Sequence, residues 1–302
     1  MLTLSSSPVL YPLSDRAVIS LTGEDRAKYL QGQVTCDVEQ LKLGDASLGA
    51  HCDSKGRLWA SFWLASLDEQ LVLILNHSLV ERQLPELKKF AVFAKAEVAD
   101  TSEKWQVFGL AGEGLSQWLN EQLDGSDNLT PDGGVVIPVA AEHALLLLPK
   151  ESAAPELPHG DEQEWQGLMI QAGMPDMSQP HQGEYIPQML NLQALNGISF
   201  TKGCYLGQET VARAKYRGAN KKAMFILAGN SDQPITINQD IELQLGDNWR
   251  RAGTVLSIYQ KNGECLVTSV LNKNLEPDAV FRIKGQDDSR LALQALPYDL
   301  ID

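Results

Sequence analysis

Short apolar runs recur along the first hundred residues, separated by polar turns and by two segments with helical spacing. Strand-like runs cover 17–22, 48–52, 58–65, 71–75 and 94–99. Helical spacing covers 24–31, and a second helix is expected from Ser78 to about Phe90. The turn 53–57, with Gly56 in it, predicts a hairpin between two of the strands. This order of elements is typical of a split α+β sandwich.

Residues 101–222 repeat a strand-then-helix pattern and end in irregular sequence. Strands are expected at 107–111, 135–139 and 144–148, with helices at 113–123 and 164–172. The last of these helices carries Trp165, Leu168 and Met169 on its apolar side, and Gly173 ends it. Prolines and glutamines replace periodic apolar residues in 174–195, which predicts a long ordered loop.

The C-terminal eighty residues contain short strand-like runs at 223–228, 241–245, 251–258, 265–271 and 279–283. Such spacing favours a small antiparallel barrel or sandwich. The chain is therefore expected to form an N-terminal α+β domain (1–100), a middle α+β domain (101–222) and a C-terminal β-barrel (223–302). The sequence leaves open whether the sheet of the N-terminal domain also includes strands from 190–200.

The charge of the chain is strongly acidic but unevenly distributed. A net charge of −14 over 302 residues repels nucleic acid and anionic membranes as a whole. In 202–222, six basic residues face Glu209 alone, a local net charge of +5. They are Lys202, Arg213, Lys215, Arg217, Lys221 and Lys222. The stretch is either a solvated helix face or a site for an anion such as a phosphate backbone.

The four cysteines, Cys36, Cys52, Cys204 and Cys265, form no CxxC pair, and no His/Cys cluster has the spacing of a zinc site. Neither a disulfide framework nor a metal site is expected. The longest apolar runs are too short to span a bilayer, and no targeting segment is evident. We expect a cytoplasmic protein with reduced thiols and no membrane contact.

Cys204 is the one cysteine with a chemical argument. It lies between Gly203 and Gly207, just before a segment of helical composition that Gly218 can close in a left-handed cap. Helix N–H groups, Lys202 and Arg213 would favour its thiolate. The alternative is that Cys204 is a small buried hydrophobe.

The sequence contains no P-loop, GxGxxG, HExxH or GxSxG motif, and the five histidines are scattered. The residues by themselves therefore name no reaction.

The octapeptide 202–209, Lys-Gly-Cys-Tyr-Leu-Gly-Gln-Glu, resembles the signature of the YgfZ family of folate-binding, tRNA-modifying proteins. This family is related to the T-protein (aminomethyltransferase) of glycine cleavage. Further segments resemble the bacterial family pattern in the same order: 23–37, 50–56, 87–93, 191–200, 213–221 and 296–298. The resemblance implies three lobes around a central channel, with ferredoxin-like α/β sandwiches and a C-terminal antiparallel β-barrel.

The resemblance also implies site residues. Cys204 is the working thiol, supported by Lys202, Tyr205, Gln208, Glu209 and Arg213. Trp165 matches a tryptophan that contacts tetrahydrofolate or a derivative, and an aromatic face suits a flat pterin ring. A second tryptophan of the pattern is replaced by Arg16, which would stack on the folate or pair with its carboxylates. The aspartate that acts in aminomethyltransferases has no counterpart in 58–64, so glycine cleavage activity is not expected.

The leading hypothesis is a folate-binding accessory protein that supports tRNA thiolation by maintaining iron–sulfur enzymes, with an influence on replication initiation implied by the family. One alternative is a tetrahydrofolate-dependent one-carbon transferase. Another is a non-catalytic tRNA- or protein-binding adapter that contacts tRNA through 202–222. The sequence leaves open whether Cys204 attacks a substrate, ligates a transient cluster iron or shapes the folate channel.

Overall fold

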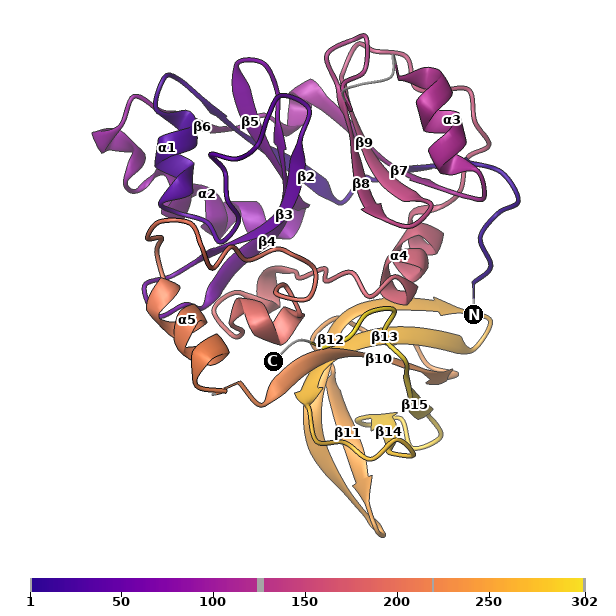
Figure 1. Ribbon diagram of the computed structural model, residues 1–302. Helices are drawn as coiled ribbons and strands as arrows, with labels where there is room; N and C mark the ends of the chain where they lie inside the picture. Colours follow the sequence, from indigo (N-terminus) through magenta and orange to yellow (C-terminus); the bar gives the residue numbers. More distant parts are fainter. Residues whose placement is uncertain (1, 124–127, 219, 301–302) are drawn as a thin grey trace.

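A computed structural model describes residues 2–123, 128–218 and 220–300. In this part of the chain, two open antiparallel sheets lie side by side above a closed barrel (Figure 1). The helix α4 (Glu162–Gln171) lies between the barrel and the sheet that contains β7, β8 and β9. The predicted α+β class with a C-terminal antiparallel barrel is confirmed.

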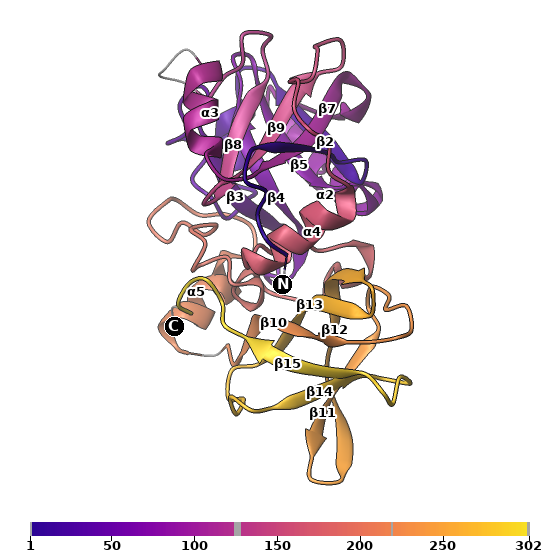
Figure 2. The same ribbon diagram turned by 90° about the vertical axis from the view of Figure 1, so that its right-hand side faces the viewer.

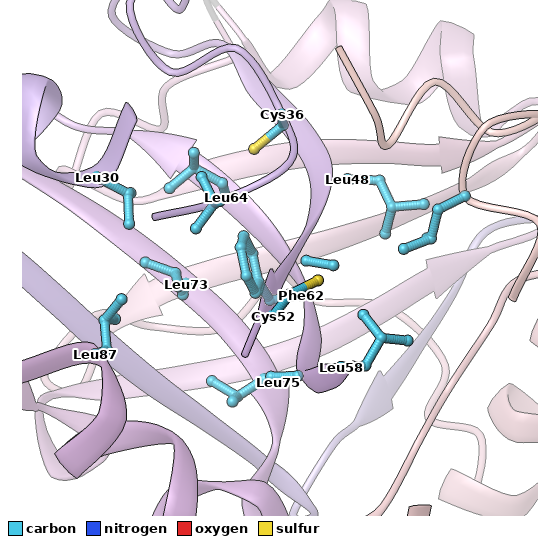
Figure 3. Packing of buried hydrophobic residues seen from close by; sticks show 14 of the residues in the cluster. Leu30, Cys36, Leu48, Cys52, Leu58, Phe62, Leu64, Leu73, Leu75 and Leu87 are labelled. Carbon is cyan, nitrogen blue, oxygen red and sulfur yellow. The ribbon is translucent and has the colours of Figure 1, made fainter. Parts of the chain in front are cut away.

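The first sheet has the strand order β3-β4-β5-β2-β6. Its strands are β2 (Arg16–Thr22), β3 (Ala46–Cys52), β4 (Leu58–Ser66), β5 (Gln70–Asn76) and β6 (Glu97–Asp100). Helices α1 (Arg26–Gln31) and α2 (Val80–Lys88) add Leu30 and Leu87 to a core that also holds Leu73 (Figure 3). The neighbouring residues Val72 and Ile74 face a second core shared with the middle lobe. Burial on both faces explains why β2, β4 and β5 are nearly continuously apolar.

The second sheet has the order β1-β7-β9-β8, with β1 (Val9–Pro12), β7 (Trp105–Ala111), β8 (Val135–Ala140) and β9 (His143–Pro149). Helix α3 (Leu115–Gln122) packs on one face, and α4 with Trp165 packs on the other. The predicted boundary at residue 100 is wrong for 9–12, because β1 pairs with β7 and not with the first sheet. Leu2 packs beside Gly167 of α4 and Tyr259 of the barrel.

The barrel consists of six antiparallel strands and closes through the pairing of β10 with β15. The strands are β10 (Lys222–Asn230), β11 (Asp240–Leu245), β12 (Asn248–Lys261), β13 (Glu264–Asn272), β14 (Val280–Ile283) and β15 (Arg290–Gln294). The sequence pattern had indicated five of them and missed β15. Figure 2 shows the barrel below the two sheets, with the N-terminal segment beside α4.

The segment between α4 and α5 (Gln208–Tyr216) is the predicted ordered loop. It contains the 3-10 helices η4 (Gln179–His181) and η5 (Pro187–Leu190); the others are η1 (His77–Leu79), η2 (Ala91–Phe93) and η3 (Ser102–Lys104). Residues 190–200 add no strand to the first sheet, although the sequence had left that addition open. Asn191 and Asn196 have φ of +60° and +57°, and left-handed residues interrupt an extended strand.

Candidate functional site

Lys202 anchors the octapeptide loop to the first lobe. Its ammonium donates hydrogen bonds to the carbonyl oxygens of Val34 at 2.8 Å and Cys36 at 2.7 Å, and the residue is only 9% exposed. Burial lowers the pKa of Lys202 to about 8. The charge of Lys202 therefore faces main-chain carbonyls inside the lobe and does not belong to a basic surface.

Tyr205 is the second anchor of the loop. Its side chain is buried in the core of the first lobe, and its ring centre lies 5.1 Å from the Lys202 ammonium. Burial raises the pKa of the Tyr205 phenol, so it remains a neutral packing residue. The next residue, Leu206, donates its N–H to the carbonyl of Gly32 at the end of α1.

Two glycines allow the octapeptide to touch the β3–β4 hairpin. Gly207 has φ of +82°, and a Cβ placed there would lie 2.6 Å from the Asp53 carbonyl oxygen and 2.9 Å from the Gly56 Cα. Gly56 has φ of +75°, and a Cβ there would lie 2.8 Å from the Cβ of Thr210 in α5. Both glycines are needed for their backbone conformation and for the closeness of the contact.

Cys204 lies between the two anchors, Lys202 and Tyr205. Its side chain is exposed, whereas Cys36, Cys52 and Cys265 are buried. Burial raises the pKa of Cys36 to about 11 and that of Cys52 further. Of the four thiols, Cys204 is thus the one placed to meet another molecule. The alternative that Cys204 is a buried hydrophobe is wrong.

The remaining supporting residues lie at the start of α5. Gln208 is its first residue, and Arg213 forms an ion pair with Glu209 one turn away, with 2.5 Å between Nη2 and Oε1. The charge of Arg213 is therefore balanced by Glu209. Because Lys202 is buried and the exposed Arg213 is paired, the exposed cations of the basic stretch for which the described residues form no ion pair are Lys215, Arg217, Lys221 and Lys222.

Sequence reasoning did not single out Thr35, although it lies within 23–37. Thr35 is fully buried; its hydroxyl donates to the Gly197 carbonyl at 2.6 Å and accepts from the Ala50 N–H at 2.9 Å. Its own carbonyl accepts from Ser199. This one side chain joins three of the segments that carry the family resemblance.

Asn191 was also missed, and it links the loop to the barrel. Its amide group donates to the Met224 carbonyl at 2.8 Å and accepts from the Met224 N–H at 3.1 Å. An asparagine suits this position because it tolerates the left-handed backbone and carries both a donor and an acceptor.

Trp165 and Arg16 lie far from the octapeptide in sequence and line one small cavity between the two sheets and α4. Trp165 is 2% exposed, and its ring packs so closely on Gly109 that a Cβ there would lie 2.4 Å from it. Arg16 donates to both carboxylate oxygens of Asp176, at 2.9 and 2.6 Å. Asp176 thus already neutralises the guanidinium.

The residues of this cavity do not fit a folate as they stand. The cavity holds about 50 Å³, whereas pockets for organic ligands span roughly 300–1,000 Å³. The strand β4 contributes Ser61, Phe62 and Trp63 to its wall, and no carboxylate. The folate contact of Trp165 stays a prediction, and Arg16 has no free charge for a folate carboxylate.

In the part of the chain that the structure describes, no three His, Cys, Asp or Glu side chains gather as a metal site requires. The described helices include none that is long and apolar enough to cross a membrane.

Comparison with known proteins agrees with this architecture. Residues 220–288 match the family model for the YgfZ β-barrel domain. The chain is 43% identical over 308 residues to the tRNA-modifying protein YgfZ of Yersinia pseudotuberculosis, covering 97% of this chain and 93% of that protein. The chain belongs to the YgfZ family. The YgfZ protein of Pectobacterium carotovorum is equally similar, with 43% identity over 311 residues, 98% of this chain and 93% of that one.

The family fold extends to a distant enzyme. The structure superposes on the glycine cleavage system aminomethyltransferase T of Bartonella henselae with a TM-score of 0.70, covering 99% of this chain and 87% of that one. The two sequences are 14% identical, so the likeness concerns the fold.

Proposed function

We propose that this YgfZ-family protein supports tRNA modification through the thiol of Cys204. The observation that carries the proposal is the exposure of this one cysteine on a loop whose neighbours, Lys202 and Tyr205, are buried anchors. A rigid loop that presents a single thiol suits a reaction or exchange with a partner molecule. The names of the relatives in Yersinia and Pectobacterium support tRNA modification as the process.

The partners that the proposal assigns are the iron–sulfur enzymes that thiolate tRNA, in the cytoplasm. The protein acts as an accessory factor; a one-carbon transferase has less support, because β4 lacks the carboxylate of the aminomethyltransferases. The exposed cations Lys215, Arg217, Lys221 and Lys222 provide the contact with tRNA.

The test is complementation of a bacterial strain whose own YgfZ gene is deleted. Thiolated nucleosides are measured by mass spectrometry in digests of total tRNA. Cys204→Ala is expected to leave thiolation at the level of the deletion strain, while Thr201→Ala, an exposed change in the same loop, restores it. Normal thiolation with Cys204→Ala, at equal protein abundance, would remove the thiol from the proposal.

Folate binding is a separate hypothesis, which the family resemblance supports and the small cavity beside Trp165 does not favour. Calorimetric titration of tetrahydrofolate and its methylene derivative into the wild type and Trp165→Ala tests ligand and site together. Binding that Trp165→Ala leaves unchanged would place the folate elsewhere.

A further inference from the structure

A cavity of about 420 Å³ lies behind α5, apart from both Cys204 and the cavity beside Trp165. It is bounded by the second half of α5, by residues after η5 and by the connection to β10. Its apolar wall consists of Ile198, Phe200 and Ala214. The volume is in the range of pockets that bind organic ligands.

Cations surround this cavity. The Lys215 ammonium lies 3.7 Å from the centre of the Phe200 ring, inside the lining. Arg217 and Lys221 are exposed and adjoin the lining residues Gly218 and Asn220 in the chain, and the exposed Lys222 follows Lys221. None of the described acidic side chains forms an ion pair with any of these four cations. In a chain of net charge −14, such a cluster selects an anionic ligand.

The other lining groups suit a flat ring with polar edges. Phe200 lines the cavity with the Lys215 ammonium over one face of its ring, and Tyr216, which follows Lys215 outside the lining, is 70% exposed. Gln188 donates its amide N–H to the Val211 carbonyl at 2.6 Å, while its Oε1 is buried and has no hydrogen-bond partner among the described residues. An amino group on an entering ring would supply the missing donor. Aromatic faces beside cations are the usual means of binding single-stranded nucleic acid.

We propose that this cavity takes the unstacked base of a single-stranded RNA nucleotide, with the flanking phosphates held by Lys215, Arg217, Lys221 and Lys222. The inference deepens the proposed function, on which it rests, by assigning the tRNA contact to a base pocket rather than to charge alone. It predicts that the affinity for single-stranded RNA depends both on Phe200 in the wall of the cavity and on the cations around it.

The experiment measures fluorescence anisotropy of a labelled ten-nucleotide single-stranded RNA with the full-length protein. Phe200→Ala is expected to weaken binding about tenfold through lost stacking, and Lys221→Glu to weaken it without affecting the fold. Phe93→Ala and Lys88→Gln, exposed residues of the first lobe, are the matched controls and should bind as the wild type does. With four phosphate contacts, raising KCl from 50 to 200 mM is expected to lower affinity about 50-fold.

Adenosine, cytidine, guanosine and uridine monophosphates, inorganic phosphate and a duplex of the same sequence are the competing probes. Tight binding of a free monophosphate without binding of the RNA would overturn the RNA assignment. Equal affinity for duplex and single strand, or competition by phosphate alone, would overturn the base pocket. Cys204→Ala is expected to retain full RNA affinity, so failure of the thiol proposal and failure of this one give different results.

Discussion

The contact between Gly207 and the β3–β4 hairpin leads to a prediction that separates backbone strain from crowding. In Gly207→Ala, the new methyl group lies 2.6 Å from the Asp53 carbonyl oxygen and 3.1 Å from the Cβ of Cys52. A left-handed alanine costs about 1 kcal/mol, and overpacking against main chain adds about 1–3 kcal/mol. We therefore expect a loss of about 2–4 kcal/mol in the free energy of unfolding.

Gly114→Ala is the matched control. Gly114 precedes α3 as Gly207 precedes α5, with φ of +77° against +82°, but no atom lies within 4 Å of its Cβ position. The free energy of unfolding of Gly114→Ala should fall only by the cost of the left-handed alanine, about 1 kcal/mol. Urea unfolding followed by tryptophan fluorescence measures both variants.

A thiol assay gives a local measure of the same contact. With Ellman's reagent, the native wild type should show one fast thiol, Cys204, because the other three are buried. Displacement of the loop in Gly207→Ala should expose Cys52 as a second reactive thiol, while Gly114→Ala should not. Equal losses of stability in the two variants, together with a protected Cys52, would refute the reasoning.

Two further predictions concern buried polar groups. Lys202→Met leaves the Val34 and Cys36 carbonyls without a donor and should destabilise the protein by about 2–6 kcal/mol in urea unfolding; a loss below about 1 kcal/mol would contradict the anchoring role. His51 is buried, and burial lowers its pKa, so the unfolded chain takes up a proton first as pH falls below about 6.5. The free energy of unfolding should fall from pH 7 to pH 5, and it should fall less steeply in His51→Gln. If the wild type and His51→Gln lose stability equally over this pH range, His51 is not the group responsible.

The fold could be predicted where the apolar pattern is long and regular. The strands β2, β4 and β5 are buried on both faces, and their apolar runs are unmistakable. Strand β1 has four residues and ends in Pro12, so the pairing of Val9 with Ala111 leaves no local signal. Strand β15 alternates weakly between buried and exposed positions. Long-range pairing, rather than local propensity, decides both strands.

The site was predictable in composition but not in orientation. The segment 202–209 marked the loop, yet local sequence could not show that Lys202 points inward and Cys204 outward. Lysine is rarely buried, and an inward lysine needs main-chain acceptors that come from 34–36, far away in sequence. The pair Glu209–Arg213, by contrast, has the i,i+4 spacing that a helix brings together, and could have been read from the sequence.

The position of Leu2 and β1 has a consequence for the order of events during synthesis. Leu2 packs beside Gly167 and Tyr259, and β1 needs β7, so these early residues wait for partners that leave the ribosome about 100 to 250 residues later. At about 5–20 residues per second, the last of these contacts forms some 10–50 s after Leu2 emerges. The core of the first lobe likewise includes Leu190, Tyr205 and Val211, so both ends of the packing arrangement depend on segments far apart in the chain.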